Sequence, residues 1–317
     1  MYWHTDPLVY FLMVQKYGLY SLRLRHLKIA ARVALVVVLI SIFSVALPFA
    51  TQPKRTVGVA ESPIAEAKQT IEAEPAQETP TKVPAVVVPV VVEPNKSQEL
   101  QAAIDDWVAA HKGTVSVTVR GITDPAVSAS NKGAAKMYTA SIYKMYAIGL
   151  MYQKINSGAW AINRGGINTD SCVERMIVVS DNSCAVAFGN LLGWQAADGE
   201  LQAQGYIGTS LNINHPWSTS NDVAELMVRL EKGEFVNAAQ RQAMVGYMKR
   251  QIYRSGIPAG SPNSIVANKV GFFDSYNTDA GIVYGPKNTY VVSIMTNGTS
   301  FAAIADLSAV IAGVMNK

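Results

Sequence analysis

Apolar residues recur with a helical period near the start of the C-terminal two thirds of the chain. Leu100, Ile104 and Val108 follow one another every four residues, and Asn95 and Gln98 have the spacing of a capping box. Together these features predict a helix that begins near residue 95 and packs along one face.

The pattern then changes from helix to strand and back. After Gly113, apolar and polar residues alternate over 114–120, which predicts a strand with one buried face, and a second strand is expected within 127–137. Residues 141–154 are apolar on most sides, which predicts a buried helix. Lys144 lies inside that helix and needs polar partners there, because a buried charge is costly without them.

The remaining segments complete the expected topology. Residues 155–235 carry further helical stretches, strands are predicted at 264–271, 280–284 and 290–296, and an apolar helix is expected over 302–315. The order helix, strands, helices, strands, helix favours an α+β fold. We therefore expect an antiparallel sheet built from both ends of this region, with a helical half inserted between them.

The region before residue 97 has a different composition. Residues 33–50 are eighteen positions without a charge, which as a helix span about 27 Å, close to the thickness of a bilayer core. Five Lys or Arg residues against one Asp in residues 1–32 predict a cytoplasmic N-terminus and an exported remainder. A cleaved signal peptide is the alternative, although 47–50 make a poor small-x-small cleavage site. Seven prolines in 51–96 predict an extended, disordered linker before a domain at 97–317.

Charge and composition exclude several functions. The net charge is +4 and the basic residues form no long block, so nucleic acid is not an implied partner. Four histidines occur without Cys-x-x-Cys or His-x-x-x-His spacing, so neither a metal nor another cofactor is indicated.

Candidate chemistry first appears at the start of the 141–154 helix. Ser141 and Lys144 are three residues apart and share a helix face, so the amine is placed to take the proton of the hydroxyl. A developing negative charge near a helix start is also stabilised by unpaired N–H groups. This pair alone is weak evidence, because serine is a common N-cap.

Two further motifs follow in a fixed order. Ser180-Asp181-Asn182 comes after the Ser-x-x-Lys motif, and Lys269-Val270-Gly271 follows on a predicted strand. This ordered set resembles that of class A β-lactamases and penicillin-recognising serine enzymes, the family that includes serine D,D-peptidases. The resemblance extends over roughly residues 97–317 and implies a β-lactamase/transpeptidase-like fold, here with a reduced helical half.

The resemblance also implies a role for each motif residue. Ser141 would be the acylated nucleophile, Lys144 its base, and Ser180 the group that passes a proton to the departing nitrogen. The backbone N–H groups of Ser141 and Phe272 would form the oxyanion hole, in which one donor contributes about 3 kcal/mol.

Substrate binding is assigned to the other motif residues in the same way. Asn182 would hold the amide side chain of the substrate, Lys269 would bind its carboxylate, and Gly271 would allow a close approach. Asp181 is expected to be a structural turn residue.

The sequence departs from the family pattern at three points. The stretch between Ser141 and Ser180 is shorter than in typical class A enzymes, which implies the reduced helical half. Val270 replaces the usual hydroxyl residue, which removes one hydrogen bond to a substrate carboxylate. The glutamate that is followed four residues later by asparagine in hydrolytic class A enzymes is not found, since Glu200 is followed by Gln204 and residues 211–220 contain no acid. His215 is a weaker candidate for the missing base, because loop histidines are usually solvated.

The two cysteines of the chain flank the Ser-Asp-Asn motif. Cys172 precedes Ser180 by eight residues and Cys184 follows it by four. An exported location favours a disulfide between them, and two buried thiols are the alternative.

These observations predict a membrane-anchored serine hydrolase that forms an acyl-enzyme with β-lactams or with D-Ala-D-Ala cell-wall peptides. Because no deacylation base is recognised, we expect slow, peptidase-like release of the acyl group. Two alternatives remain open: a true β-lactamase with an unrecognised base, and a wall-binding module without turnover.

Overall fold

The computed structural model describes residues 95–212 and 214–317 of the chain. The predictions of a basic N-terminus, a transmembrane helix and a linker therefore lie almost wholly outside the described residues. Within the described part, no helix combines the length and apolar character needed to cross a bilayer.

A five-stranded antiparallel sheet forms the centre of the domain. Its strand order is β2-β1-β9-β8-β7, so the first strands of the domain pair with the last ones. The bounds are β1 Thr114–Gly121, β2 Ser128–Asn131, β7 Ile265–Phe273, β8 Tyr276–Tyr284 and β9 Thr289–Asn297. This arrangement confirms the predicted sheet made from both ends of the region, with β7 at one edge.

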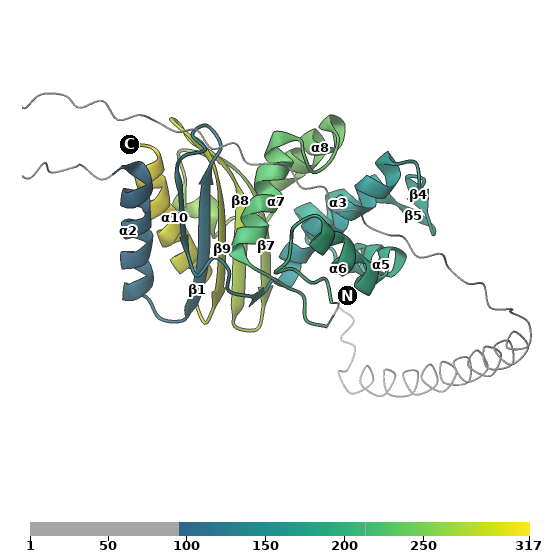
Figure 1. Cartoon of the computed structure of the whole chain (residues 1–317), viewed down its shortest axis with the longest axis horizontal. Helices are drawn as coiled ribbons and strands as arrows, with labels where there is room; N and C mark the ends of the chain where they lie inside the picture. Colours follow the sequence, from purple (N-terminus) through teal and green to yellow (C-terminus); the bar gives the residue numbers. More distant parts are fainter. Residues whose placement is uncertain (1–94, 213) are drawn as a thin grey trace, which may run out of the picture. The chain divides into compact units, whose positions relative to one another are not determined.

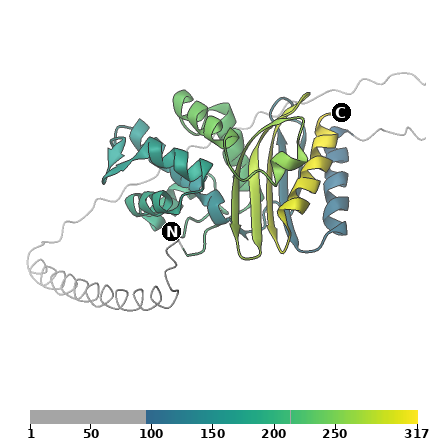
Figure 2. The same cartoon turned by 180° about the vertical axis from the view of Figure 1, so that it is seen from behind.

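Two long helices cover one face of this sheet (Figures 1 and 2). They are α2, Lys96–Ala110, and α10, Phe301–Met315, and the short helix α9, Ile257–Gly260, packs beside α10. The predicted capping box at the start of α2 is present, with Asn95 accepting from Gln98 N at 3.0 Å. Leu100, Ile104 and Leu307 are fully buried between the helices and the sheet.

The inserted helices lie against the other face. Helix α7 packs on β1, β8 and β9, while α8 packs on β7. A large apolar core joins these helices to the sheet and includes Met145, Phe188 and Met227. The bounds are α3 Tyr143–Asn156, α4 Thr169–Val178, α5 Asn182–Leu192, α6 Trp194–Ala203, α7 Ser220–Lys232 and α8 Ala238–Lys249.

Short elements connect these parts. A one-turn 3-10 helix, η1, covers Ala140–Ile142 just before α3, and two-residue strands pair as β3 Met137–Tyr138 with β6 Trp217–Ser218. A second small pair, β4 Asn163–Arg164 with β5 Ile167–Asn168, lies at the tip of the helical half.

The structure corrects three local predictions. Strand β1 is buried on both faces, because α7 covers the polar face and Ser220 Oγ lies 2.8 Å from the hydroxyls of both Ser116 and Thr118. The second predicted strand is limited to β2 and β3. Ser141 does not begin an α-helix, since it lies in η1 and α3 begins two residues later.

Candidate active site

Ser141 lies in a strained turn between β3 and α3. Ala140, the residue before it, has φ +43, a conformation that is unfavourable for a residue with a Cβ atom. Thr139 fixes the turn from the other side, because its backbone N–H donates to Pro216 O at 2.9 Å. Ser141 is partly exposed and lines a cavity of about 260 Å³.

Lys144 is fully buried on α3 and points toward the Ser-Asp-Asn motif. Its Nζ donates to Ser180 O at 2.6 Å, to Asn182 Oδ1 at 2.7 Å and to Ser180 Oγ at 3.3 Å. In the described part of the chain, no hydrogen bond joins the side chains of Lys144 and Ser141. Burial lowers the pKa of Lys144 to about 8, and the negative charge of Asp181 partly opposes this effect.

Ser180 occupies the turn between α4 and α5 in a left-handed conformation, with φ +61. Its hydroxyl lies between two amines: Lys269 Nζ is 3.0 Å from Ser180 Oγ, and Lys144 Nζ is 3.3 Å from it. The left-handed backbone directs the side chain into this position at a cost in local strain. The serine and lysine motifs, far apart in sequence, therefore meet at one hydroxyl.

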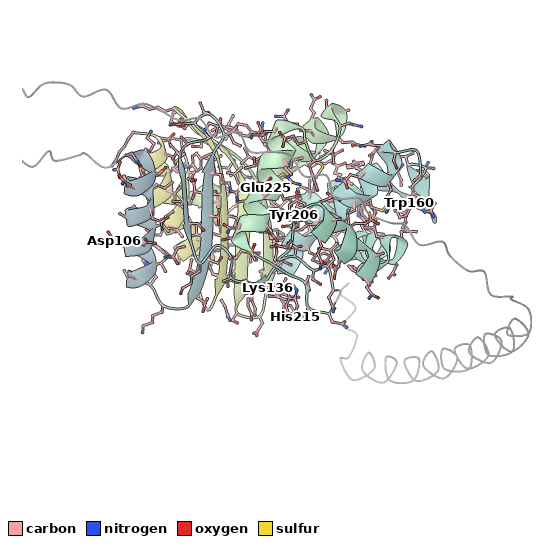
Figure 3. All side chains as sticks on the ribbon, in the orientation of Figure 1. Asp106, Lys136, Trp160, Tyr206, His215 and Glu225 are labelled. Carbon is pink, nitrogen blue, oxygen red and sulfur yellow. A yellow bond between two sulfur atoms is a disulfide. The ribbon has the colours of Figure 1, made fainter. Side chains whose placement is uncertain are left out.

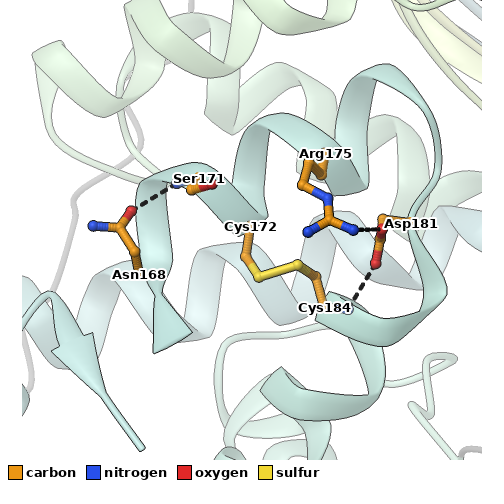
Figure 4. Close-up of a disulfide and its surroundings, with 6 residues drawn as sticks. All are labelled: Asn168, Ser171, Cys172, Arg175, Asp181 and Cys184. Atoms are coloured by element: carbon orange, nitrogen blue, oxygen red, sulfur yellow. Dashed lines mark hydrogen bonds and ion pairs between the residues drawn. A yellow bond between two sulfur atoms is a disulfide. The ribbon is translucent and has the colours of Figure 1, made fainter. Parts of the chain in front are cut away.

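The neighbours of Ser180 hold the turn in place (Figure 4). Asp181 caps α5 by accepting from Cys184 N at 2.8 Å, and Arg175 forms an ion pair with the same carboxylate. The hydrogen bond from Cys184 N is the main cause that lowers the pKa of Asp181. The predicted disulfide is present, with 5.4 Å between the Cα atoms of Cys172 and Cys184, and it ties α4 to α5.

Lys269 reaches Ser180 from the edge strand β7. Alternation along the strand puts Lys269, Gly271 and Phe273 on the face toward the helical half, whereas Val270 is buried, with 1% of its surface exposed, and does not line the cavity. Lys269 Nζ also donates to Val270 O at 2.6 Å. Burial and then the neighbouring charge of Lys144 lower the pKa of Lys269 well below its usual value.

Gly271 permits a close contact within the protein. A Cβ atom at this position would lie 2.5 Å from Thr139 O and 2.6 Å from Ser141 N. The glycine is therefore needed for β7 to approach η1. Phe272 follows it and lines the cavity together with Ser141 and Asn182.

Asp279 is a buried acid on β8 that belongs to none of the three sequence motifs. Asp279 accepts from Asn268 Nδ2 and from Ile257 N, each at 2.8 Å. Burial raises the pKa of Asp279 to about 7 against the opposing effect of these bonds. In the sequence, the only indication of this buried acid is its position within a strand-forming segment.

Neither Glu200 nor His215, the candidate bases considered from the sequence, lines the cavity. Glu200 pairs with Lys154 at 2.7 Å, and Lys154 lies ten residues, or about 15 Å of helix, beyond Lys144. The His215 ring packs at a tilt against the Tyr138 ring, with 4.9 Å between the centroids. Figure 3 shows His215 near Lys136 at one edge of the domain.

The segment between α6 and α7 is held by two other acids. Asp198 accepts from Ser210 Oγ at 2.7 Å and from Leu211 N at 2.6 Å. Asp222 accepts from Gly208 N at 2.9 Å and from Thr209 Oγ1 at 2.8 Å. Neither acid lines the cavity.

Comparisons with known proteins agree with this geometry. The Beta-lactamase enzyme family matches residues 166–314. The structure of PBP-A has 19% identity and a TM-score of 0.62, covering 68% of this chain and 96% of that one. A mutant of PBP-A, described as an acyl-enzyme complex with penicillin G, has 20% identity and a TM-score of 0.62, with the same coverage of 68% and 96%.

A β-lactamase from Sphaerobacter thermophilus has 19% identity and a TM-score of 0.59, and the match covers 68% of this chain and 95% of that one. Comparison with curated proteins found no match. The structural likeness shows the β-lactamase/transpeptidase fold. Together with the family match over residues 166–314, it supports a class A β-lactamase-like serine enzyme.

Proposed function

We propose that this protein forms an acyl-enzyme on Ser141 with β-lactams and with D-Ala-D-Ala cell-wall peptides, and releases the acyl group slowly. The observation that carries the proposal is the convergence of Lys144 and Lys269 on the hydroxyl of Ser180, beside the cavity that Ser141 lines. Two amines and a hydroxyl in contact can move a proton without a carboxylate.

The proposed acylation of a β-lactam conserves atoms and charge. Neutral Lys144 takes the proton of Ser141, whose Oγ forms a bond to the lactam carbonyl carbon. The C–N bond of the ring then breaks, and its nitrogen receives a proton through Ser180. The backbone N–H groups of Ser141 and Phe272 would stabilise the negative oxygen, and Lys269 would bind the substrate carboxylate.

The lowered pKa of Lys144 supports its assignment as the base. With a pKa of about 8, roughly a tenth of the amines are neutral at pH 7. An ordinary lysine would be almost entirely protonated there. Burial therefore supplies the basic form that serine activation requires.

The expectation of slow deacylation rests on the residues that line the cavity. Among the described residues that line the cavity there is no acid or histidine. The acids that contact the segment between α6 and α7, Asp198 and Asp222, accept hydrogen bonds from that segment. Water that attacks the ester would then lack a carboxylate or imidazole as general base, and such a base typically contributes a factor of about 10²–10⁴.

Intact mass spectrometry of the full chain with penicillin G tests this proposal. We expect an adduct that persists for many minutes and is absent from Ser141→Ala. An adduct that decays while penicillin is consumed would instead identify a true β-lactamase with another base. Absence of any adduct in a folded protein would favour a binding module without turnover.

The proposal includes a membrane anchor at residues 33–50, with the catalytic domain outside the cell. It rests on the uncharged run of eighteen residues and the cations before it. Protease treatment of intact cells should remove the domain and leave a membrane-bound N-terminal fragment. A domain found only in the soluble fraction would contradict the anchor and leave the acylation proposal intact.

A further inference from the structure

The cavity beside Ser141 has an aromatic lining. Tyr138 and Tyr143 lie on either side of the serine turn, and Phe272 and Phe273 come from the end of β7. We call the side chains of Tyr138, Tyr143 and Phe273 the aromatic wall; the Phe272 ring alternates to the other face of β7 and packs on Tyr253 and Phe301. Burial raises the pKa of Tyr143 to about 12, so its hydroxyl is neutral at physiological pH. No described residue that lines the cavity carries a formal charge at neutral pH.

Neighbouring rings hold the aromatic wall in position. The Tyr138 ring lies 5.5 Å from that of Phe273 and 5.4 Å from that of Tyr276, measured between centroids. The Phe272 ring contacts Tyr253 at 5.2 Å in an edge-on arrangement. Such contacts orient the rings before any ligand arrives.

The same rings still present apolar surface to solvent. Phe273 is 62% exposed and Phe272 is 49% exposed, although they end a strand whose residues 266–271 are buried. Adjacent exposed aromatic side chains around a cavity are typical of a ligand-binding groove.

The position of the serine identifies what the cavity would hold. Ser141 itself lines the cavity. When an acyl group is bound to Ser141 Oγ, the part of that group next to its carbonyl therefore lies in the cavity. Lys269 and Ser180, the assigned partners of the substrate carboxylate and the departing nitrogen, do not line it. The cavity is thus left for the side chain of the acyl group.

We infer that the aromatic wall selects acyl donors whose side chain is uncharged and aromatic, with Phe273 as a specificity-determining residue. This inference rests on the proposed acylation of Ser141. An aromatic ring would bury the exposed face of Phe273, whereas a carboxylate there would lose its hydration without gaining a cationic partner.

Three penicillins with the same nucleus test the inference on the full chain. They carry a phenylacetamido, an acetamido or an α-carboxyphenylacetamido side chain, and the second-order rate of adduct formation is measured by intact mass. We expect the phenylacetamido compound to react at least about tenfold faster than either of the others, the discrimination that a hydrophobic pocket commonly gives.

Matched variants on β7 locate the effect. Phe273→Ala should reduce the phenylacetamido-to-acetamido rate ratio severalfold. Ile265→Ala should leave the ratio unchanged, because Ile265 is 61% exposed on the same strand but does not line the cavity.

The two proposals fail differently. Equal rates for the three compounds, or a ratio that Phe273→Ala does not alter, would overturn the aromatic selection while acylation of Ser141 stands. If none of the compounds forms an adduct, the proposed function itself fails, and the inference fails with it.

Discussion

Two segments that line the Ser141 cavity are built in opposite ways. The Ser180 turn, residues 179–182, contributes Asn182 and is fixed by a disulfide, a helix cap and contacts with two buried lysines. The loop at residues 204–219 contributes Pro216 and has no acid in its sequence. Acids from neighbouring helices are used to hold that loop.

This difference corresponds to the two steps of acyl transfer, formation of the ester and its hydrolysis. The Ser180 turn concentrates the groups that form the ester, while the loop lacks a free carboxylate to direct water at it. Under the proposed function, the Ser180 turn serves acylation and the loop supplies no carboxylate for deacylation. Substitutions at or near either segment test this contrast.

The largest expected effect is on acylation, through Lys144. Lys144→Met should retain most of the side-chain volume but remove the base, so we expect the rate of penicillin adduct formation to fall by about 10²–10⁴. Lys154→Met is the matched control on the same helix, because Lys154 pairs with Glu200 and should not affect acylation. An unchanged rate in a folded Lys144→Met would show that another group activates Ser141.

The disulfide gives the next largest effect, on stability. It joins cysteines twelve residues apart, and replacing both by serine should lower the free energy of unfolding by about 3 kcal/mol. Urea unfolding measures this change, and the same assay on reduced wild-type protein provides the control. A loss below about 1 kcal/mol would show that the cap and ion pair of Asp181 suffice to hold the Ser180 turn.

A smaller effect is expected on the opposite segment. Asp198→Asn weakens two hydrogen bonds to residues 210 and 211 and should lower the free energy of unfolding by about 2 kcal/mol. The adduct lifetime should not change, because Asp198 is assigned no role in the chemistry. Glu200→Gln, on the same helix but paired with Lys154, is the control. A longer lifetime in Asp198→Asn would identify this acid as a deacylation base and break the comparison.

The sequence allowed most of the fold and the motif set to be predicted. The spacing of apolar residues and the order of the predicted elements indicate the sheet made from both ends of the domain. The capping box identifies Asn95 as the N-cap of α2. The motif residues Ser180, Lys144 and Lys269 do meet, because helix and strand periods fix which face each side chain occupies.

The rest depends on contacts between distant segments. Alternation along β1 predicts an exposed polar face, whereas Ser220 from α7 supplies hydrogen-bond partners to Ser116 and Thr118 and so permits their burial. Tyr138 and Phe273 look like core residues in sequence, and only tertiary packing puts them beside Ser141. Asp279 is buried because Asn268 and Ile257 N supply its partners.

The smallest expected effect is a difference in pH dependence between the two steps. Burial holds the pKa of Lys144 near 8, so the neutral fraction rises from about a tenth at pH 7 to about nine tenths at pH 9. The lysine accepts a proton only when neutral, so acylation should rise about tenfold over this range. Pre-steady-state adduct formation measures this rise, with Ser141→Ala correcting for alkaline opening of the lactam. Adduct decay should show no ionisation in the range of a carboxylate, because no free acid faces the ester among the described cavity residues. A decay rate that titrates near pH 4–6 would place a carboxylate base at the ester, and the contrast between the Ser180 turn and the loop would then be wrong.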